Sequence, residues 1–416
     1  MAVRTRTPDN GRHPVADAER DALLRDPYPR YAEAREAPGL TFLPEMDAWL
    51  VSRDADVREV LRRPGDFSSA NALRGGQVPP PAVLAELARG LGGSPVVVTS
   101  DGPAHQRYRA PLVRGLSPAR VAAIAPYVAE RAEALIAGFA QAGRVELVGA
   151  YSRRLPGEVV GRLLGLDPED VPVAVEASYR AEELFFQPGG EREKVAAARE
   201  VVALQHLLDG YARRRRDDPR DDLCTEVVQA LAPGRAPLTA EQRSELVSNL
   251  QNLLIAGHLT TTALIGTAVL HLLEDPARWD LLRERPDLIP AAVEECARYD
   301  APVQAFRRLT TRPVTLAGTE LPAGAAVLVA YGSANRDGER HERPDELDVT
   351  RAARRHVAFG HGAHACPGAQ LAREQVRITL ETLARLLPGL RLDPDRPVVM
   401  APTLIHRSPE ELHLLW

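Results

Sequence analysis

The chain has 416 residues, a net charge of −5 at pH 7 and 44% hydrophobic residues, which is enough for a sizeable core. This weakly acidic balance argues against a nucleic-acid-binding protein, which needs a basic surface. Three widely separated cysteines suggest no disulfide framework, and residues 1–30 contain neither the apolar core of a signal peptide nor a membrane anchor. We therefore expect a soluble, cytoplasmic protein that does not span a membrane.

The N-terminal quarter is expected to contain short elements and one long irregular segment. Residues 1–20 should be loose, followed by a helix over 31–36, a strand over 49–52 and a helix from there to residue 61. Residues 71–100 are rich in Gly and Pro, and long irregular segments in compact domains are usually functional. Val97 is an apolar candidate for ligand contact in this segment, although core packing would explain it equally well.

Helices should dominate the middle of the chain. Apolar periodicity predicts them from residue 101 onward, over 118–140, 155–165 and 173–187, and then to residue 216. His105 and Arg109 are four residues apart and therefore share one helix face, which could also be a solvated face. Phe185 and Phe186 precede a break at Pro188 and could belong either to the core or to a ligand site.

A capping-box pattern at residues 239–242 starts a helix that should cross the whole molecule and end near Leu273. Midway, Gly257 precedes a run of threonines, which weakens a helix and favours a local opening of its hydrogen-bond ladder. Such openings often mark functional sites. Ala256, Gly257 and Thr260 are predicted to share one face, with room for a planar ligand beside one hydroxyl.

The C-terminal part mixes helices with short strands. A helix is expected over 289–299, extended stretches over 303–308, 314–316 and 326–330, and a β-hairpin over 400–405. Glu295 and Arg298 lie three residues apart in the first of these and can form an ion pair. Such pairs are common on helix surfaces, so this one by itself indicates little.

Cys366 lies in a glycine-rich stretch just before a helix predicted over 369–387. Glycines let a backbone approach a flat ligand closely, and the free N–H groups at a helix start favour a thiolate. A lone cysteine is more often a small buried hydrophobe. Here, however, Phe359, Gly362, Cys366 and Gly368 stand in the order F-x-x-G-x-x-x-C-x-G.

This order resembles the cysteine-ligand loop of the cytochrome P450 family in its bacterial form. The resemblance extends from Trp49 to Trp416, in the family's order and spacing. It implies a mainly α fold with small β-regions, forming a single domain over residues 21–416. Haem b would lie between the long central helix and the C-terminal cysteine loop.

The resemblance also implies roles for particular side chains at the haem. Cys366 would be the axial iron ligand, whose electron donation favours O–O cleavage, with Phe359 packing near its sulfur and Gly360 contacting the haem. Propionate contacts would come from His105, Arg109, Arg308 and His364, and the planar fork of arginine suits carboxylates.

Further roles lie away from the haem plane. A buried trio of Glu295, Arg298 and Arg351 would be structural. Substrate contacts would come from Val97, Phe185, Phe186, Leu253, Val303, Phe306 and Leu404, the last at the tip of the expected C-terminal hairpin.

The sequence departs from the family pattern at one catalytic position. Thr260, together with Ala256 and Gly257, matches the motif in which a threonine hydroxyl steadies dioxygen and a preceding acid helps to deliver protons. The acid position is Leu259. Water, His258 or the substrate would have to replace the missing proton donor.

The resemblance implies an NAD(P)H-supported, O2-dependent oxidation, most simply a hydroxylation, of a small organic molecule in bacterial specialised metabolism. The sequence contains no flavin or iron–sulfur segment, so electrons are expected from a ferredoxin with its reductase or from a flavodoxin-type donor. An acidic ferredoxin would dock on a basic face formed by Arg354, Arg355, His361 and Arg373.

Two alternatives remain open. Leu259 increases the weight of an atypical outcome, such as oxidative coupling, ring formation or nitration. The second alternative is a haem-thiolate protein that binds a ligand without turnover, although the retained Thr260 argues against it. The sequence does not decide whether the substrate is free or tethered to a carrier protein, and we expect a monomer.

Overall fold

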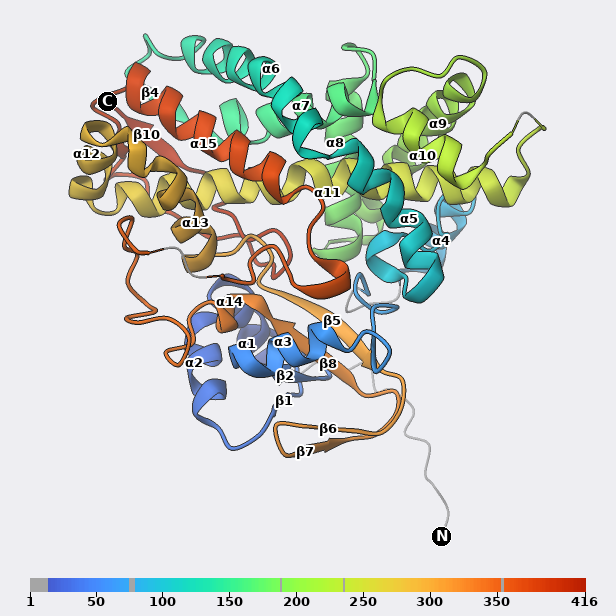
Figure 1. Cartoon of the computed structure of the whole chain (residues 1–416), viewed down its shortest axis with the longest axis horizontal. Coiled ribbons are helices and arrows are strands. Elements are labelled where there is room, and N and C mark those ends of the chain that lie inside the picture. Colours follow the sequence, from blue (N-terminus) through green and yellow to red (C-terminus); the bar gives the residue numbers. More distant parts are fainter. Residues whose placement is uncertain (1–13, 75–78, 188, 235, 353–354) are drawn as a thin grey trace.

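The computed structural model describes residues 14–74, 79–187, 189–234, 236–352 and 355–416, so the expectation of a loose segment at residues 1–13 lies outside it. Within these residues the protein is mainly helical with three small sheets, which confirms the predicted fold class (Figure 1). The α-helices are α1 (Pro14–Arg25), α2 (Tyr28–Glu36), α3 (Asp54–Arg62), α4 (Pro81–Leu87), α5 (Gly102–Gly115), α6 (Pro118–Ala137), α7 (Arg154–Leu164), α8 (Val171–Phe186), α9 (Glu191–Asp217), α10 (Leu223–Leu231), α11 (Ala240–Leu273), α12 (Pro276–Glu284), α13 (Ile289–Tyr299), α14 (Tyr331–Ala334) and α15 (Ala369–Leu386).

Short helical turns and strands complete the chain. The short turns are η1 (Val97–Thr99), η2 (Val148–Ser152), η3 (Pro286–Leu288) and η4 (Gly362–His364). The strands are β1 (Thr41–Leu43), β2 (Ala48–Val51), β3 (Phe67–Ser68), β4 (Arg144–Glu146), β5 (Ala305–Thr310), β6 (Val314–Leu316), β7 (Thr319–Leu321), β8 (Ala326–Ala330), β9 (Arg391–Leu392) and β10 (His413–Leu415).

Helix α11 is the central element of the fold. The predicted capping box is present, because Thr239 Oγ1 accepts a hydrogen bond from Gln242 N (3.2 Å) and Thr239 N donates to Gln242 Oε1 (3.0 Å). The helix crosses the molecule and packs against α7, α8, α9, α13 and α15 (Figure 1). By length and composition alone this helix could cross a membrane, but 78% of its apolar window is buried by the rest of the fold.

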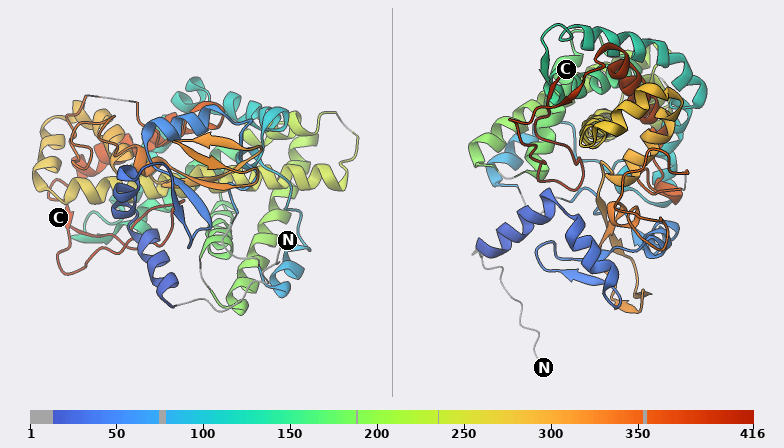
Figure 2. Two further views of the ribbon diagram at one scale, coloured as in Figure 1. Left: turned by 90° about the horizontal axis from the view of Figure 1, so that it is seen from below. Right: turned by 90° about the vertical axis from the view of Figure 1, so that its left-hand side faces the viewer.

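The β-rich part lies on one side of the helices. Figures 1 and 2 show α1, α2, α3 and the largest sheet together as a region separate from the helical layers. This sheet has the strand order β1-β2-β8-β5-β3, in which β2 and β8 are parallel and the other pairs antiparallel. Strand β5 therefore brings Phe306 and Arg308 from the C-terminal part of the chain next to β3, which lies in its N-terminal quarter.

Residues 14–20, which were expected to be loose, form the first turns of α1. Leu23 in the same helix is buried against residues of β1, β2 and β8. Arg25 at its end donates to Met400 O (2.7 Å) and to Glu410 Oε1 (2.9 Å). The helix is thus held by contacts that local sequence does not reveal.

The expected β-hairpin over residues 400–405 is not a regular one. A single isolated bridge pairs Met400 with Pro409 in this part of the described chain. Leu404 O accepts a hydrogen bond from Gln304 N (2.7 Å), and the Leu404 side chain is 5% exposed in the same apolar cluster as Leu23. Because Ala401 N donates to Ser408 O (2.9 Å) and Glu410 N donates to Val399 O (2.8 Å), Leu404 lies in the connection between the two paired stretches, and its side chain packs in the core.

Asp300 is fully buried and joins both ends of the chain to α11. Its carboxylate accepts hydrogen bonds from Tyr28 Oη (2.7 Å) and Arg407 Nε (2.6 Å), and it lies 2.9 Å from His271 Nε2. Burial raises the pKa of Asp300, but the hydrogen bond from His271 and the charge of Arg407 hold it well below its usual value. The carboxylate stays ionised and ties α2, α11 and the C-terminal loop together.

Candidate functional site

The cysteine loop is built from tight turns that end at α15. Cys366 N donates to Phe359 O (2.8 Å). Gly360 and Gly362 have φ of 72° and 69°, the left-handed region that favours glycine. A Cβ atom on Gly362 would lie 2.5 Å from Leu61 O, so the loop packs directly on the backbone of α3.

The sulfur of Cys366 is accessible and has donors around it. Cys366 is the exposed one of the three cysteines, and the other two are buried. Desolvation by the surrounding residues raises the pKa of the thiol. The N–H of Gly368 and the charges of Arg109 and Arg373 act in the opposite direction. These groups favour the thiolate that a metal would bind.

Four basic side chains gather beside this loop: His105, Arg109, Arg308 and His364. The ring centroids of the two histidines are 4.1 Å apart. Burial and the neighbouring charge of Arg308 lower the pKa of His364 to about 4, while burial and the charge of Arg109 lower the pKa of His105. Both imidazoles are therefore neutral at pH 7, and the two arginines carry the positive charge.

The two arginines lack an anionic partner within the described residues, whereas Nε2 of His364 lies 3.8 Å from Asp101 Oδ1. Neither arginine forms an ion pair there; Arg109 Nη2 donates to Ala365 O (2.6 Å) and Arg308 Nη1 to Arg307 O (2.7 Å), although Arg308 is only 3% exposed. Nε2 of His105 is buried without a hydrogen-bond partner. A cavity of about 390 Å³, lined in part by His105 and Arg109, opens beside them. Because an unpaired buried charge is costly, this arrangement fits an anionic ligand group.

Ser69 helps to hold His364 and was missed by sequence reasoning. Ser69 Oγ lies 3.0 Å from His364 Nε2, and Ser69 N donates to Asp101 Oδ1 (3.0 Å). Nothing in the local sequence around this serine predicts its contact with His364. Asn335 Oδ1 accepts a hydrogen bond from Val357 N (2.7 Å) at the start of the cysteine loop, and Asn335 lies in the stretch Ala-Asn-Arg-Asp, which is part of the family resemblance.

Helix α11 presents Ala256 and Thr260 on its open side. Ala256 is exposed and Thr260 half-buried. The predicted opening of the helix is absent, because Thr260 Oγ1 donates to Ala256 O (3.0 Å) while the helix continues unbroken. Gly257 is not on this face: a Cβ atom there would lie 2.6 Å from a Val160 methyl group, so the glycine lets α7 approach α11.

The neighbouring residues His258 and Leu259 are buried. Leu259 is 2% exposed, and both ring nitrogens of His258 lack a hydrogen-bond partner beside Tyr179. Burial and the charges of His406 and Arg153 lower the pKa of His258 to about 3. His258 is thus neutral at pH 7 and is a poor replacement for the missing acid.

Known proteins share this arrangement over nearly the whole chain. A family model described as Cytochrome P450 matches residues 277–388. The Nocardicin C N-oxygenase of Nocardia uniformis subsp. tsuyamanensis is 36% identical over 408 residues, which cover 95% of this chain and 97% of that enzyme. This chain belongs to the cytochrome P450 family.

Solved P450 structures have the same fold. Cytochrome P450 CREJ in complex with (4-ethylphenyl) dihydrogen phosphate is 28% identical, with a TM-score of 0.87 and coverage of 94% of this chain and 98% of that chain. P450BioI in complex with hexadec-9Z-enoic acid ligated acyl carrier protein is 26% identical, with a TM-score of 0.82 and coverage of 95% and 99%. This protein is accordingly a P450 monooxygenase.

Haem b is the cofactor of cytochrome P450s, and the residues of this chain fit it. Cys366 would ligate the iron, and the uncompensated Arg109 and Arg308, with Nε2 of the buried His105, would hold the propionates. Within the described residues no group of three or more His, Cys, Asp or Glu side chains could hold a metal ion.

Replacing Arg308 with alanine should weaken haem retention without changing the axial ligand. A charged hydrogen bond contributes roughly 1.5–3 kcal/mol, or about ten- to a hundredfold in affinity. We would measure haem transfer from the P450 to an excess of a haem-free acceptor protein. Arg312→Ala, which removes an exposed arginine paired with Asp66, is the matched control. Unchanged haem affinity in both Arg308→Ala and Arg109→Ala would refute the assignment.

Glu295 and Arg298 are buried and form a hydrogen-bonded network with the half-buried Arg351. Arg298 donates twice to the Glu295 carboxylate (2.7 and 2.8 Å), and Arg351 Nε donates to Glu295 Oε1 (2.9 Å). Arg298 also donates to the carbonyl oxygens of Asn335 (2.9 Å) and Pro344 (2.7 Å). The trio thereby joins α13 to the chain that leads into the loop.

The expected substrate-contact residues fall into separate regions. Val97 and Leu253 belong to one apolar cluster between α5 and α11, and Val303 and Phe306 pack against another beneath the large sheet. Phe185, at the end of α8, is 41% exposed, and Phe186 next to it is half-buried.

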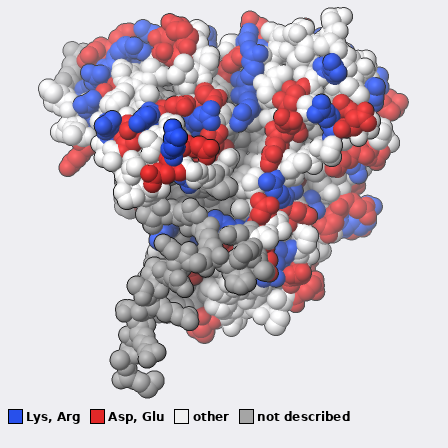
Figure 3. All heavy atoms as spheres, turned by 180° about the vertical axis from the view of Figure 1, so that it is seen from behind, with Lys and Arg blue, Asp and Glu red and all other residues white. Residues whose placement is uncertain are grey.

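The expected ferredoxin face is less basic than the sequence suggests. Arg373 Nη2 lies 3.0 Å from Glu294 Oε2, and its guanidinium lies 4.3 Å from the centroid of the Phe359 ring, so its charge is compensated. Arg355 is exposed and His361 half-buried, while Arg354 lies outside the described residues. On the face opposite to Figure 1, basic and acidic side chains are interspersed (Figure 3).

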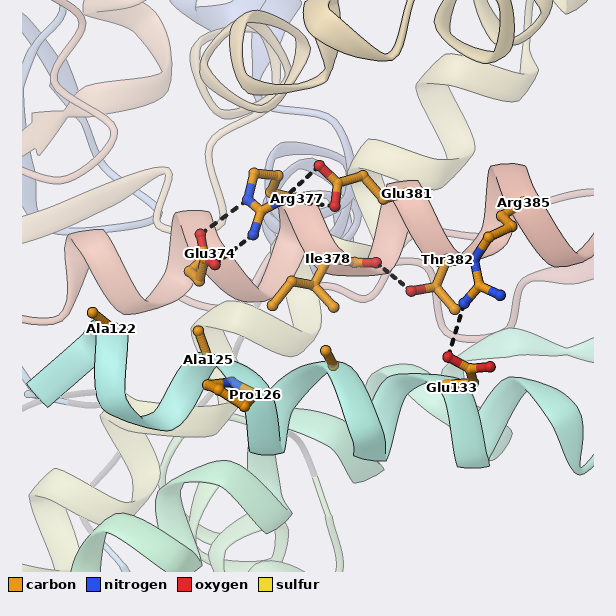
Figure 4. A pocket seen from close by; sticks show the side chains of 11 residues that line it. Ala122, Ala125, Pro126, Glu133, Glu374, Arg377, Ile378, Glu381, Thr382 and Arg385 are labelled. Atoms are coloured by element: carbon orange, nitrogen blue, oxygen red, sulfur yellow. Dashed lines mark hydrogen bonds and ion pairs between the residues drawn. The ribbon is translucent and has the colours of Figure 1, made fainter.

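A second hollow, of about 430 Å³, lies between α6 and α15 (Figure 4). Alanines of α6 form one wall, and charged residues of α15 form the other. Arg377 pairs with Glu374 and Glu381, and Arg385 pairs with Glu133. Because these lining charges neutralise one another, the groove does not resemble the cation-rich site beside Cys366.

Proposed function

We propose that this P450 hydroxylates a small organic molecule in bacterial specialised metabolism. It would use O2 and electrons from a separate ferredoxin with its reductase, or from a flavodoxin-type donor. The observation that carries the proposal is that both reactive elements are retained: the accessible thiol of Cys366 and the Thr260 hydroxyl on the open face of α11. We further propose a cytoplasmic monomer with one catalytic domain over residues 21–416.

Particular side chains would share the work in this reaction. The bound haem supplies the activation of O2. Cys366 would ligate its iron, and Arg109 and Arg308 would fix its orientation through the propionates. Thr260 Oγ1 directs its proton to Ala256 O, so its lone pairs are free to accept a hydrogen bond on the open side. Leu259 offers no proton.

A panel of small organic compounds tests this proposal. Binders would be identified by spectral shifts of the loaded protein and then incubated with O2, NAD(P)H, ferredoxin and ferredoxin reductase. We expect at least one binder to gain an oxygen atom derived from O2. Binding with no product from any binder would favour the ligand-binding alternative.

Leu259→Glu should change the ratio of product formed to reductant consumed. General acid–base assistance is typically worth about 10²–10⁴ in rate, and a hydrocarbon side chain cannot supply it. For an ordinary hydroxylation with a weakened proton supply, the restored carboxylate should raise the ratio. Product and reductant would be measured with the same substrate in both proteins.

Leu259→Gln is the matched control, because it introduces a polar side chain of similar size without an ionisable group. A ratio that is equal in all three proteins, with the fold intact and the carboxylate shown to ionise, would mean that position 259 has no part in proton delivery. A ratio that falls in Leu259→Glu would instead favour a reaction that needs a longer-lived oxygen adduct.

Because Leu259 replaces the usual acid, a second candidate reaction is oxidative coupling, ring formation or nitration at the same haem. Product analysis distinguishes these outcomes, because none of them simply inserts one oxygen atom into the substrate. The substrate could also be tethered, since P450BioI has been solved with an acyl carrier protein. Comparing a free acid with its carrier-bound thioester in the same assay decides between the two forms.

A further inference from the structure

The irregular segment before α5 is clamped by one buried glutamine of α9. Gln205 is 5% exposed, and its Oε1 accepts hydrogen bonds from Leu91 N (2.9 Å) and Gly92 N (3.1 Å). Its Nε2 donates to Gln251 Oε1 (3.1 Å) on α11. One side chain of α9 therefore connects the backbone of this segment to the central helix.

Two glycines make this close approach possible. A Cβ atom on Gly90 would lie 1.9 Å from Gln205 Oε1, and one on Gly92 would lie 2.3 Å from Gln205 Nε2. Neither position has a left-handed φ, so the glycines are needed here for space and not for backbone conformation. Glycine at positions 90 and 92 thus leaves the space that the side-chain amide of Gln205 occupies.

Polar contacts with α11 hold the same segment further along. Ser94 N donates to Ser248 Oγ (3.1 Å), and Ser94 Oγ lies 2.8 Å from Ser244 Oγ. Asn249 Nδ2 donates to Pro95 O (3.4 Å). Every one of these partners lies on α11, in the half of the helix that precedes Ala256.

Apolar packing attaches α4 to α8 and α9. Val83 and Leu87 of α4 pack in one cluster with Ala198 and Val201 of α9 and with Leu184 near the end of α8. Helix α4 also packs directly against α9. The segment from α4 to Pro95 is therefore attached to α9 and α11 before it leads into η1, which begins at Val97.

We propose that Gln205 is a positioning residue that sets the size of the substrate site. By fixing the backbone at Leu91 and Gly92, it would hold the segment that carries Val97 against Leu253 of α11. The inference rests on the proposed oxidation of a small molecule near these residues. Without the clamp, the segment should be less ordered, and ligands that reach it should bind more weakly.

Gln205→Leu tests the clamp because it keeps the volume of the side chain and removes its hydrogen bonds. We expect the Leu91 and Gly92 amides to exchange hydrogen about tenfold faster, with the amides in the middle of α9 unchanged. Gln205→Glu should restore slow exchange, because the carboxylate still accepts from both amides and Gln251 can rotate its amide to donate. Gly92→Ala should reproduce the faster exchange by displacing the glutamine, whereas Gly65→Ala, which has open space around it, should not.

Ligand size provides the second measurement, independent of turnover. Imidazole and 4-phenylimidazole would be titrated into the haem-loaded proteins. For Gln205→Leu we expect about three- to tenfold weaker binding of 4-phenylimidazole, because the wall that it contacts must first be ordered, and little change for imidazole. Unchanged exchange at Leu91 and Gly92, or equal changes for both azoles, would overturn the proposal. Failure of the oxidation itself would appear as absent product while both of these measurements still hold.

Discussion

Cys366→His is expected to retain haem but to lose the strongly red-shifted Soret band that thiolate ligation gives to the reduced carbonyl complex. The imidazole has no thiolate sulfur to donate electron density to the iron. Oxidation of any substrate should fall to background for the same reason. The measurement is the difference spectrum of the reduced protein with and without carbon monoxide.

Cys224→Ala provides the matched control for this spectrum. Cys224 is buried, and burial raises the pKa of its thiol to about 12, so it cannot replace the ligand. We expect the control to keep the red-shifted band. A band retained in Cys366→His would remove Cys366 from the role of ligand.

Glu295→Ala should be the most destabilising single substitution among the residues discussed here. It leaves the guanidinium of Arg298, 2% exposed, without its carboxylate, and it removes a partner from Arg351 and from the backbone N–H of Asp348. Breaking a buried pair from one side typically costs about 3–5 kcal/mol. We expect a much lower unfolding midpoint and loss of haem on mild warming, measured by circular dichroism and by the Soret absorbance.

Asp280→Ala removes an exposed partner of Arg283 and is the control, with little change expected. The pH dependence provides a further check. Burial raises the pKa of Glu295, but hydrogen bonds and charge from Arg298 hold it below its usual value. Its contribution to stability is therefore present at neutral pH and disappears as the pH falls through the folded-state pKa. An unfolding midpoint for Glu295→Ala close to that of the unmodified protein would contradict the structural role.

Local sequence was a good guide to the helices and strands. The predicted helix over 289–299 and the strands over 314–316 and 326–330 coincide with α13, β6 and β8. The capping box predicted at residues 239–242 is present. These features depend on side-chain periodicity and on contacts between residues three or four apart, which the sequence displays directly.

Some expectations failed because they concern which neighbouring element a residue faces in the fold, and local sequence does not reveal this. Gly257 was assigned to the open face of α11, but the structure turns it towards Val160 of α7. Arg373 was assigned to a free basic face, but Glu294 compensates its charge.

By itself, the sequence determined the family motif around Cys366, the mainly helical class and the absence of an acid at position 259, because each is carried by residue types at short spacing. Tertiary structure alone decided that His258 would be buried and neutral, that Arg109 and Arg308 would both lie near His364 without an ion-pair partner among the described residues, and that Gln205 would clamp Leu91 and Gly92. The pairs involved are separated by more than a hundred residues in the chain, so their contact depends on how α5, α9, α11 and β5 pack and not on any local pattern.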